Sequence, residues 1–189
     1  MPPKVRITRE GIINAAIDMI RKNGVEALNA RSLAAALQCS TQPIFSNFAT
    51  MDVLQKAVME AAFDLYLDFL RREAASGEYP VYKAYGMAYI RFAQEERALF
   101  KLLFMCDRQG QPPVMTADRE ESISMIMQAN GLSYARAEML HLEMWACVHG
   151  IATMLVTSFV ELDWQLISNM VTDVYQGARK HHMEMEAQQ

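Results

Sequence analysis

Two short helices joined by a tight turn can be traced between Asn29 and Asp52, and this stretch constrains the fold more than any other. Asn29 is suited to cap the first helix, because its short side chain can accept a backbone N–H that the helix leaves unpaired. Leu33, Ala34 and Leu37 then fall on one face at three- and four-residue spacing. The turn follows at residues 38–40. A chain with this pattern is expected to begin with a small helical module.

The second helix of the pair is expected to begin at Ser40 or Thr41, one of which would cap it. Pro43 lies near its first position, where a missing N–H does no harm. Ile44 and Phe48 are four residues apart and point inward together. A short helix of this kind suits the major groove of DNA if its outward side chains are small, polar or flat. The outward side chains here are Thr41, Gln42, Phe45, Ser46 and Asn47.

Residues 8–54 resemble the DNA-binding head of the TetR family of bacterial repressors. The residues that carry this resemblance are Arg9, Ile12, Ala15-Ala16, Gly24, Leu33-Ala34 and the run from Ser40 to Phe48. A second block, Trp145-Ala-Cys-Val-His149-Gly150, resembles a Trp…His-Gly motif in the ligand-binding half of one subgroup of that family. The segment from Arg91-Phe92-Ala93 through Leu99-Phe100 to Phe104 also resembles this subgroup. The resemblance implies a ligand-responsive regulator of transcription, most simply a repressor, that acts as a homodimer.

The fold class expected from the sequence is all-α, with about nine helices. Glycine and proline number only 8 and 6, and no stretch shows apolar alternation at period two. We expect a DNA-binding helix-turn-helix head of three helices over residues 1–52, and a helical ligand-binding and dimerisation bundle over residues 53–189. The first helix is expected from Thr8 to Asn23. A fourth helix is expected to begin at Thr50 or Asp52 and to reach about Ala75. Later helices are expected at about 81–94, 97–105, 115–129, 133–160 and 163–182, with a loop at 107–113 and a frayed tail after Lys180.

The run from Met144 to Val160 is strongly apolar, but it is shorter than the roughly 20 residues that a membrane-spanning helix needs. We therefore interpret it as a buried helix. No secretory signal is visible at the N-terminus, and Cys39, Cys106 and Cys147 are not at the spacing of metal ligands. These features predict a cytoplasmic protein without metal, cofactor or membrane.

Charge is distributed unevenly along the chain. The whole sequence carries −4, which does not by itself indicate nucleic acid. The first 50 residues, however, hold six basic and three acidic side chains, so they carry +3 and the remainder carries −7. A basic head on an acidic body fits a module that meets phosphate at one end, although an ordinary solvated surface could show the same scatter.

Candidate contacts to an operator come from the second helix of the pair and from Arg31. Gln42 and Asn47 carry amides that can pair with adenine, and the ring of Pro43 can touch a thymine methyl. Arg31 and the backbone N–H groups at the start of the second helix are candidates for phosphate. The full set is Arg31, Ser40, Thr41, Gln42, Pro43, Phe45, Ser46 and Asn47, and for each of these residues an exposed helix surface is the competing interpretation.

The head departs from the family pattern at four positions. Phe45 replaces a tyrosine that binds phosphate in the family, Asn47 replaces a common histidine, and Met51 replaces a usual lysine. Gln38 replaces a glycine in the turn, so a left-handed conformation is expected there at a cost of ~1 kcal/mol or more. Fewer phosphate contacts predict a shallower dependence of DNA affinity on salt.

The C-terminal half is expected to bind a small hydrophobic effector in an apolar pocket with His149 and Tyr89 as polar groups. A filled core, in which Trp145 and His149 are simply packed together, is an equal alternative for each residue. The predicted lining is Met87, Phe92, Phe100, Phe104, Met125, Trp145 and His149. The resemblance further implies that the last two helices form a four-helix interface with a second copy, through Leu155, Phe159, Trp164, Ile167, Met170, Val171 and Val174.

Two other functional classes compete with a regulator that binds a palindromic double-stranded operator. An enzyme is disfavoured, because no glycine-rich phosphate loop, nucleophile elbow or metal-binding spacing is present. A helical adaptor would use the outward face of residues 41–47 to bind protein instead of DNA. Only a binding experiment separates the adaptor from the regulator.

Overall fold

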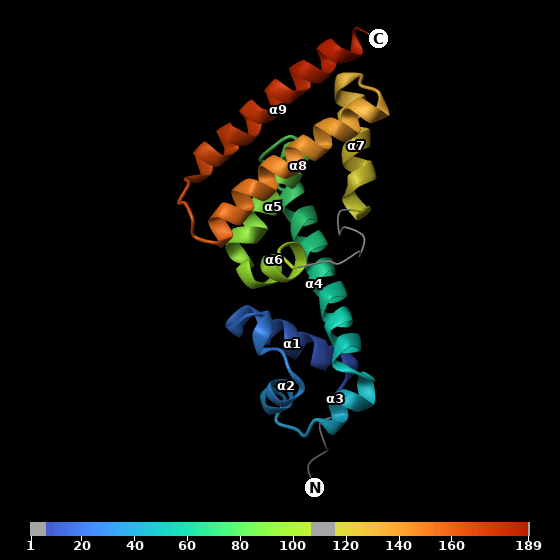
Figure 1. Ribbon diagram of the computed structural model, residues 1–189, viewed down its shortest axis with the longest axis vertical. Coiled ribbons are helices and arrows are strands. Elements are labelled where there is room, and N and C mark those ends of the chain that lie inside the picture. The colour runs from blue at the N-terminus through green and yellow to red at the C-terminus, as the bar shows by residue number, and fades with distance from the viewer. Residues whose placement is uncertain (1–6, 107–115, 189) are drawn as a thin grey trace. The chain divides into compact units, whose positions relative to one another are not determined.

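The computed structural model describes residues 7–106 and 116–188, and all regular structure in these residues is helical (Figure 1). The prediction of an all-α fold is confirmed. The predicted loop at 107–113 and the first six residues lie outside the described residues. The helices are α1 (Arg9–Asn23), the short 3-10 helix η1 (Val25–Ala27), α2 (Ala30–Ala36), α3 (Gln42–Asn47), α4 (Met51–Ala74), α5 (Val81–Glu95), α6 (Arg97–Phe104), α7 (Thr116–Asn130), α8 (Tyr134–Val156) and α9 (Trp164–Glu186).

These helices group into two compact units. The first unit contains the described residues up to Leu67 together with Glu96–Cys106, so α6 belongs with α1, α2 and α3. The second unit contains Asp68–Glu95 and the described residues from 116 onwards. The chain therefore leaves the first unit, returns to it for α6, and leaves it again. The functional boundary predicted at residue 52 remains a proposal.

Local capping rules account for the helix ends of the first unit. The Thr8 hydroxyl accepts the Gly11 N–H at 3.1 Å, and Gly24 ends α1 with φ +82°. The Asn29 carboxamide oxygen accepts the N–H groups of Arg31 and Ser32 at 3.1 and 3.0 Å, as the sequence predicted. Unpaired N–H groups at both helix starts are thus satisfied by side chains.

The turn between α2 and α3 agrees with the sequence in one respect and differs in another. Gln38 has φ +51°, so the predicted left-handed residue is present without a glycine. The capping prediction was wrong in its detail, because Thr41 precedes α3 in a helical conformation and its side chain makes no capping hydrogen bond. Since α3 has only six residues, the structure around it must hold it in place.

The core beneath α3 is closed. Ile12, Ile20, Leu33 and Ile44 are each 0 % exposed, and Phe48 is 1 % exposed. The side chain of Arg21 on α1 also forms a two-pronged ion pair with Glu96 at the start of α6, at 2.9 and 2.7 Å. The packing of α6 on α1 gives the small head the additional buried surface that a three-helix module of this size needs.

In the second unit α8 is the central helix, with α5, α7 and α9 packed against it. Helices α8 and α9 lie side by side in opposite directions (Figure 1). By length and apolar composition α8 is the single described helix that could cross a membrane, a test that core helices also pass. Its buried residues, among them Leu140, Met144 and Val148, lie inside the unit and support the prediction of a core helix.

The ends of the last two helices differ from the expected ones. Helix α8 stops at Val156, earlier than expected, and Ser158 follows with φ +55°. The prediction of a frayed tail was wrong, because α9 continues to Glu186 and His182 is only 2 % exposed. The imidazole Nε2 of His182 lies 3.1 Å from a Glu143 carboxylate oxygen on α8. This contact and the burial of His182 hold the final turns of α9 against α8. The polar composition of the tail does not by itself indicate that these turns are ordered.

Candidate functional site

The outward face of α3 presents its side chains to solvent as the sequence predicted. Gln42, Phe45 and Ser46 are exposed, with 46 % of Phe45 accessible, whereas Thr41, Pro43 and Asn47 are half-buried. Ser40 before the helix and Arg31 on α2 are exposed as well. The eight predicted contact residues are therefore all at least partly accessible.

Two of the polar side chains on α3 are already bound to their own helix. The Ser46 hydroxyl donates to the Gln42 carbonyl at 2.9 Å, and the Asn47 amide donates to the Pro43 carbonyl at 2.8 Å. Hydrogen bonds of this kind, four residues back along a helix, compete with contacts to a partner. Gln42 and Thr41 form no such bond through their side chains among the described residues. Helical spacing in the sequence predicts that all four side chains face outward. It does not show which of them are bonded to their own helix and which are available to a partner.

Arg9 supports the C-terminal end of α3, a role that was not predicted from the sequence. Its guanidinium donates to the Asn47 carbonyl at 3.0 Å and lies 4.2 Å from the centre of the Phe48 ring. A cation is favourable at the carbonyl end of a helix and over an aromatic face. The six residues of α3 are thus held from below by Ile44 and at their end by Arg9.

A second cluster, in the second unit, joins Tyr89 of α5 with Trp145 and His149 of α8. The rings of Trp145 and His149 stack with their centroids 4.8 Å apart and their planes at 8°. The Tyr89 hydroxyl lies 2.8 Å from His149 Nδ1. Burial lowers the pKa of His149 and raises the pKa of Tyr89, so both groups are neutral near pH 7. A protonated phenol is placed to donate to Nδ1, which leaves the imidazole proton on Nε2.

The remaining residues of the predicted pocket do not all join this cluster. Met87 and Phe92 are buried on α5 in the same unit, at 2 % and 1 % exposure, and Met125 on α7 is half-buried. Phe100 and Phe104 instead belong to the first unit, where their rings lie 5.1 Å apart. The spacing of aromatic residues along the sequence could not show that α6 packs with the head.

A second tyrosine–histidine pair lies on the same two helices and was missed by the sequence analysis. The Tyr82 hydroxyl lies 3.1 Å from His141 Nδ1, two helical turns before the Tyr89–His149 pair on both α5 and α8. Burial, and secondarily the positive charge of Arg119, lower the pKa of His141. The seven-residue spacing of Tyr82 and Tyr89, beside an eight-residue spacing of the histidines, was the available sequence signal.

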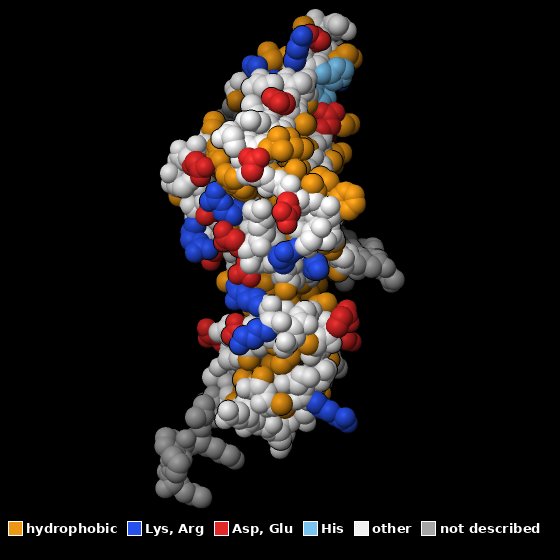
Figure 2. Space-filling model, turned by 90° about the vertical axis from the view of Figure 1, so that its left-hand side faces the viewer, with side chains coloured by type: hydrophobic (Ala, Val, Ile, Leu, Met, Phe, Trp, Pro, Cys, Tyr) orange, Lys and Arg blue, Asp and Glu red, His pale blue; other side chains and the backbone are white. Residues whose placement is uncertain are grey.

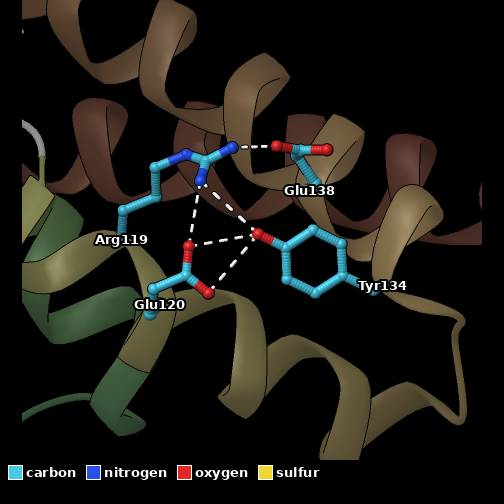
Figure 3. A network of polar contacts seen from close by, with 4 residues as sticks. All are labelled: Arg119, Glu120, Tyr134 and Glu138. Carbon is cyan, nitrogen blue, oxygen red and sulfur yellow. Dashed lines mark hydrogen bonds and ion pairs between the residues drawn. The ribbon is translucent and has the colours of Figure 1, made fainter.

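Helix α7 is joined to α8 by a polar network around Arg119 (Figure 3). Its guanidinium pairs with Glu138 and, at 3.0 Å, with Glu120. The Tyr134 hydroxyl completes the network by donating to Glu120 at 3.1 Å. Among the described residues, no three His, Cys, Asp or Glu side chains are grouped to hold a metal ion. The network is thus an anchor between two helices.

The predicted dimer residues fall into two groups in the single chain. Phe159 and Val174 are 81 % and 41 % exposed, and Leu155, Trp164 and Met170 are half-buried. Ile167 and Val171 are 0 % and 3 % exposed, so their side chains are packed inside the protomer and are not available to a second copy. Trp164 has partners within its own unit, since its indole N–H donates to the Tyr79 hydroxyl at 3.1 Å and Arg91 lies over its ring at 4.6 Å.

Further apolar side chains of α8 and α9 that the prediction omitted are also exposed. Met139 and Leu142 on α8 are 49 % and 50 % exposed, and Leu166 on α9 is 43 % exposed. Figure 2 shows hydrophobic side chains gathered over the second unit on the face it draws, with charged side chains scattered around them. Large exposed apolar groups in one region of a soluble protein usually mark a partner surface.

Comparisons with known proteins agree with this architecture. Residues 82–172 match the family model described as the tetracycline repressor-like C-terminal domain. A crystal structure of a TetR-like transcriptional regulator from Rhodococcus sp. RHA1 is similar to this chain with a TM-score of 0.67 and 13 % identity, over 92 % of this chain and 96 % of the other. A member of the TetR family from Streptomyces coelicolor A3 is similar with a TM-score of 0.62 and 19 % identity, over 90 % and 98 % of the two chains.

A search among curated proteins finds no match. The domain match lies in the C-terminal half of the chain, and each structural match covers at least 90 % of the chain. Residues 82–172 thus resemble the C-terminal domain of tetracycline repressor-like proteins, and the chain as a whole has the fold of TetR-like transcriptional regulators.

Proposed function

We propose that this chain is a ligand-responsive repressor that binds a palindromic operator as a homodimer in the cytoplasm and releases it when a small hydrophobic molecule binds. The observation that carries the proposal is the outward face of α3. It exposes Gln42 and Phe45, while Ile44 on the inner side of the helix and Phe48 at its C-cap are fully packed. An enzyme is disfavoured, because the matched domain model and the similar structures are those of TetR-like transcriptional regulators.

The dimer proposal is supported by the exposed apolar residues of α8 and α9. Leu142, Phe159, Leu166 and Val174 present large hydrophobic side chains to solvent in the single chain. A two-fold dimer would cover them and hold two copies of α3 at a fixed distance, roughly one helical turn of DNA (~34 Å) or a multiple of it. Ile167 and Val171 support this interface from beneath, because they pack α9 onto its own protomer.

The effector proposal is supported by the neutral cluster of Tyr89, Trp145 and His149. A ligand beside these residues would meet aromatic faces and a single polar pair without a fixed charge, which suits an uncharged or weakly polar aromatic molecule. For such a ligand to release DNA, it must bind the DNA-incompetent conformation of the dimer more tightly than the competent one. The subgroup defined by the motif from Trp145 to Gly150 remains a prediction.

The test is selection of bound fragments from genomic DNA at low salt, followed by anisotropy titrations of the enriched site. We expect one enriched palindrome, and we expect Gln42→Ala to weaken its binding by on the order of tenfold while leaving unfolding unchanged. Gln94→Ala is the matched control, because Gln94 is an exposed glutamine on α5 in the other unit. Failure to retain any fragment would favour the helical adaptor, which binds protein through the same face.

A further inference from the structure

The segment that contains the outward face of α3 has no charged side chain. Residues 38–50 include neither Lys, Arg, Asp nor Glu. Of the flanking basic residues, Arg9 is engaged with the Asn47 carbonyl and the Phe48 ring at the protein side of the helix end. Guanine is most often read in the major groove by the paired donors of Arg or by Lys. This face has no group of that type to offer.

The hydrogen-bonding groups of the α3 face further limit which base it can recognise. Ser46 and Asn47 donate to carbonyls of their own helix, at 2.9 and 2.8 Å. The amide of Gln42 is exposed and has no such bond among the described residues. A carboxamide donates and accepts side by side, which matches the N7 acceptor and N6 amino donor of adenine.

Phe45 adds an apolar group to the same face. It lies three residues after Gln42, so the two side chains are neighbours on the helix surface. Its apolar side chain is 46 % exposed to water. Because it has no hydroxyl, it can form no hydrogen bond to phosphate. The apolar feature that the major groove offers to such a ring is the 5-methyl group of thymine.

We infer that the outward face of α3 reads A·T pairs in each half-site, with Gln42 at an adenine and Phe45 against a thymine methyl. The inference rests on the proposed function, since it assumes that α3 enters the major groove. It goes beyond that function by assigning the base class and by making Phe45 a residue that determines specificity. Arg9 acts as a positioning residue, because it fixes the end of the helix that carries both side chains.

The test replaces single thymines of the enriched site by deoxyuridine, which removes only the 5-methyl group and keeps base pairing. At one or two symmetric positions we expect the parent protein to bind about fourfold more weakly, the effect of one buried methyl group. Phe45→Ala should bind the thymine and uracil sites equally at those positions. Val53→Ala, which truncates an exposed apolar side chain of α4 in the same unit, is the control and should keep the parent's discrimination.

Two results would overturn the inference while leaving the proposed function intact. One is a parent protein that binds its operator but is indifferent to every uracil substitution. The other is a Phe45→Ala variant that retains full discrimination at the same thymines. The substitutions in DNA need no protein variant, so the first result is decisive even if Phe45→Ala binds weakly. A parent that binds no DNA at all would instead remove the proposed function itself.

Discussion

Polar side chains are exposed on the outward face of α3 but are paired with each other at the contact between α5 and α8. On α3, Gln42 is exposed on a short helix with a closed core beneath it. Between α5 and α8, the phenols of Tyr82 and Tyr89 are bonded to His141 and His149 within the unit. The first region leaves polar side chains open to solvent, whereas the second pairs its polar groups with each other away from water.

This difference separates two ways in which a substitution acts. A change on an open recognition face alters binding and leaves the folded state nearly untouched, because solvent replaces the lost side chain. A change inside a packed or paired region alters the stability first and affects binding through it.

The largest effect is expected at the exposed apolar surface of α8 and α9. Phe159 is 81 % exposed in the single chain and would be covered in the proposed dimer. Phe159→Glu should therefore convert the dimer to monomers, because dimerisation would bury an unpaired charge. Without the tether between heads, operator affinity should fall by on the order of a hundredfold or more. Sedimentation and anisotropy measure the two effects. Leu65→Glu, an exposed leucine of the first unit, is the control and should remain dimeric.

A pair of neighbours on α3 gives the next largest effect. Ile44 is fully buried, and Ile44→Ala should lower the free energy of unfolding by about 2–4 kcal/mol by leaving a cavity. Phe45→Ala, one residue further on, should change it by about 1 kcal/mol or less, because nearly half of that side chain is already in water. Denaturant unfolding of both variants is the measurement. Equal losses would show that Phe45 is a packing residue and not an open contact.

The smallest effect is expected from the two histidines between α5 and α8. Burial lowers the pKa of His141 and His149 in the folded chain, so below about pH 6.5 the unfolded chain binds more protons. Stability should therefore be complete above pH 6.5 and should decline as the pH falls below that value toward the folded-state pKa. His149→Gln should flatten the dependence, as measured by unfolding midpoints between pH 7.5 and 5. An unchanged slope in both His141→Gln and His149→Gln would contradict this assignment.

Much of the first unit was predictable because its rules are local. Thr8 and Asn29 cap their helices, Gly24 ends α1, and Gln38 takes the left-handed turn, all from side chains acting within a few residues of each other. The exposure of Gln42 and Phe45 follows from helical spacing over the inward pair Ile44 and Phe48. What the local rules missed is Arg9, which reaches α3 across 38 residues of sequence.

The second unit was predictable only at the level of its helices. Which histidine meets which tyrosine depends on the relative register of α5 and α8, and periodicity within one helix does not fix it. The burial of Ile167, Val171 and His182 has the same origin, because it depends on how α9 rotates against α8. A frayed tail was predicted from polar composition, and the contact of His182 with Glu143 replaced it with an ordered helix.

The central claim is that two copies of the uncharged α3 face read one operator together. The most direct measurement is the number of chains bound per DNA duplex, by mass photometry or sedimentation, on the enriched palindrome and on a duplex with one half-site scrambled. We predict two chains on the palindrome and a large loss of affinity on the scrambled duplex. One chain per duplex, bound equally well to both, would contradict the account.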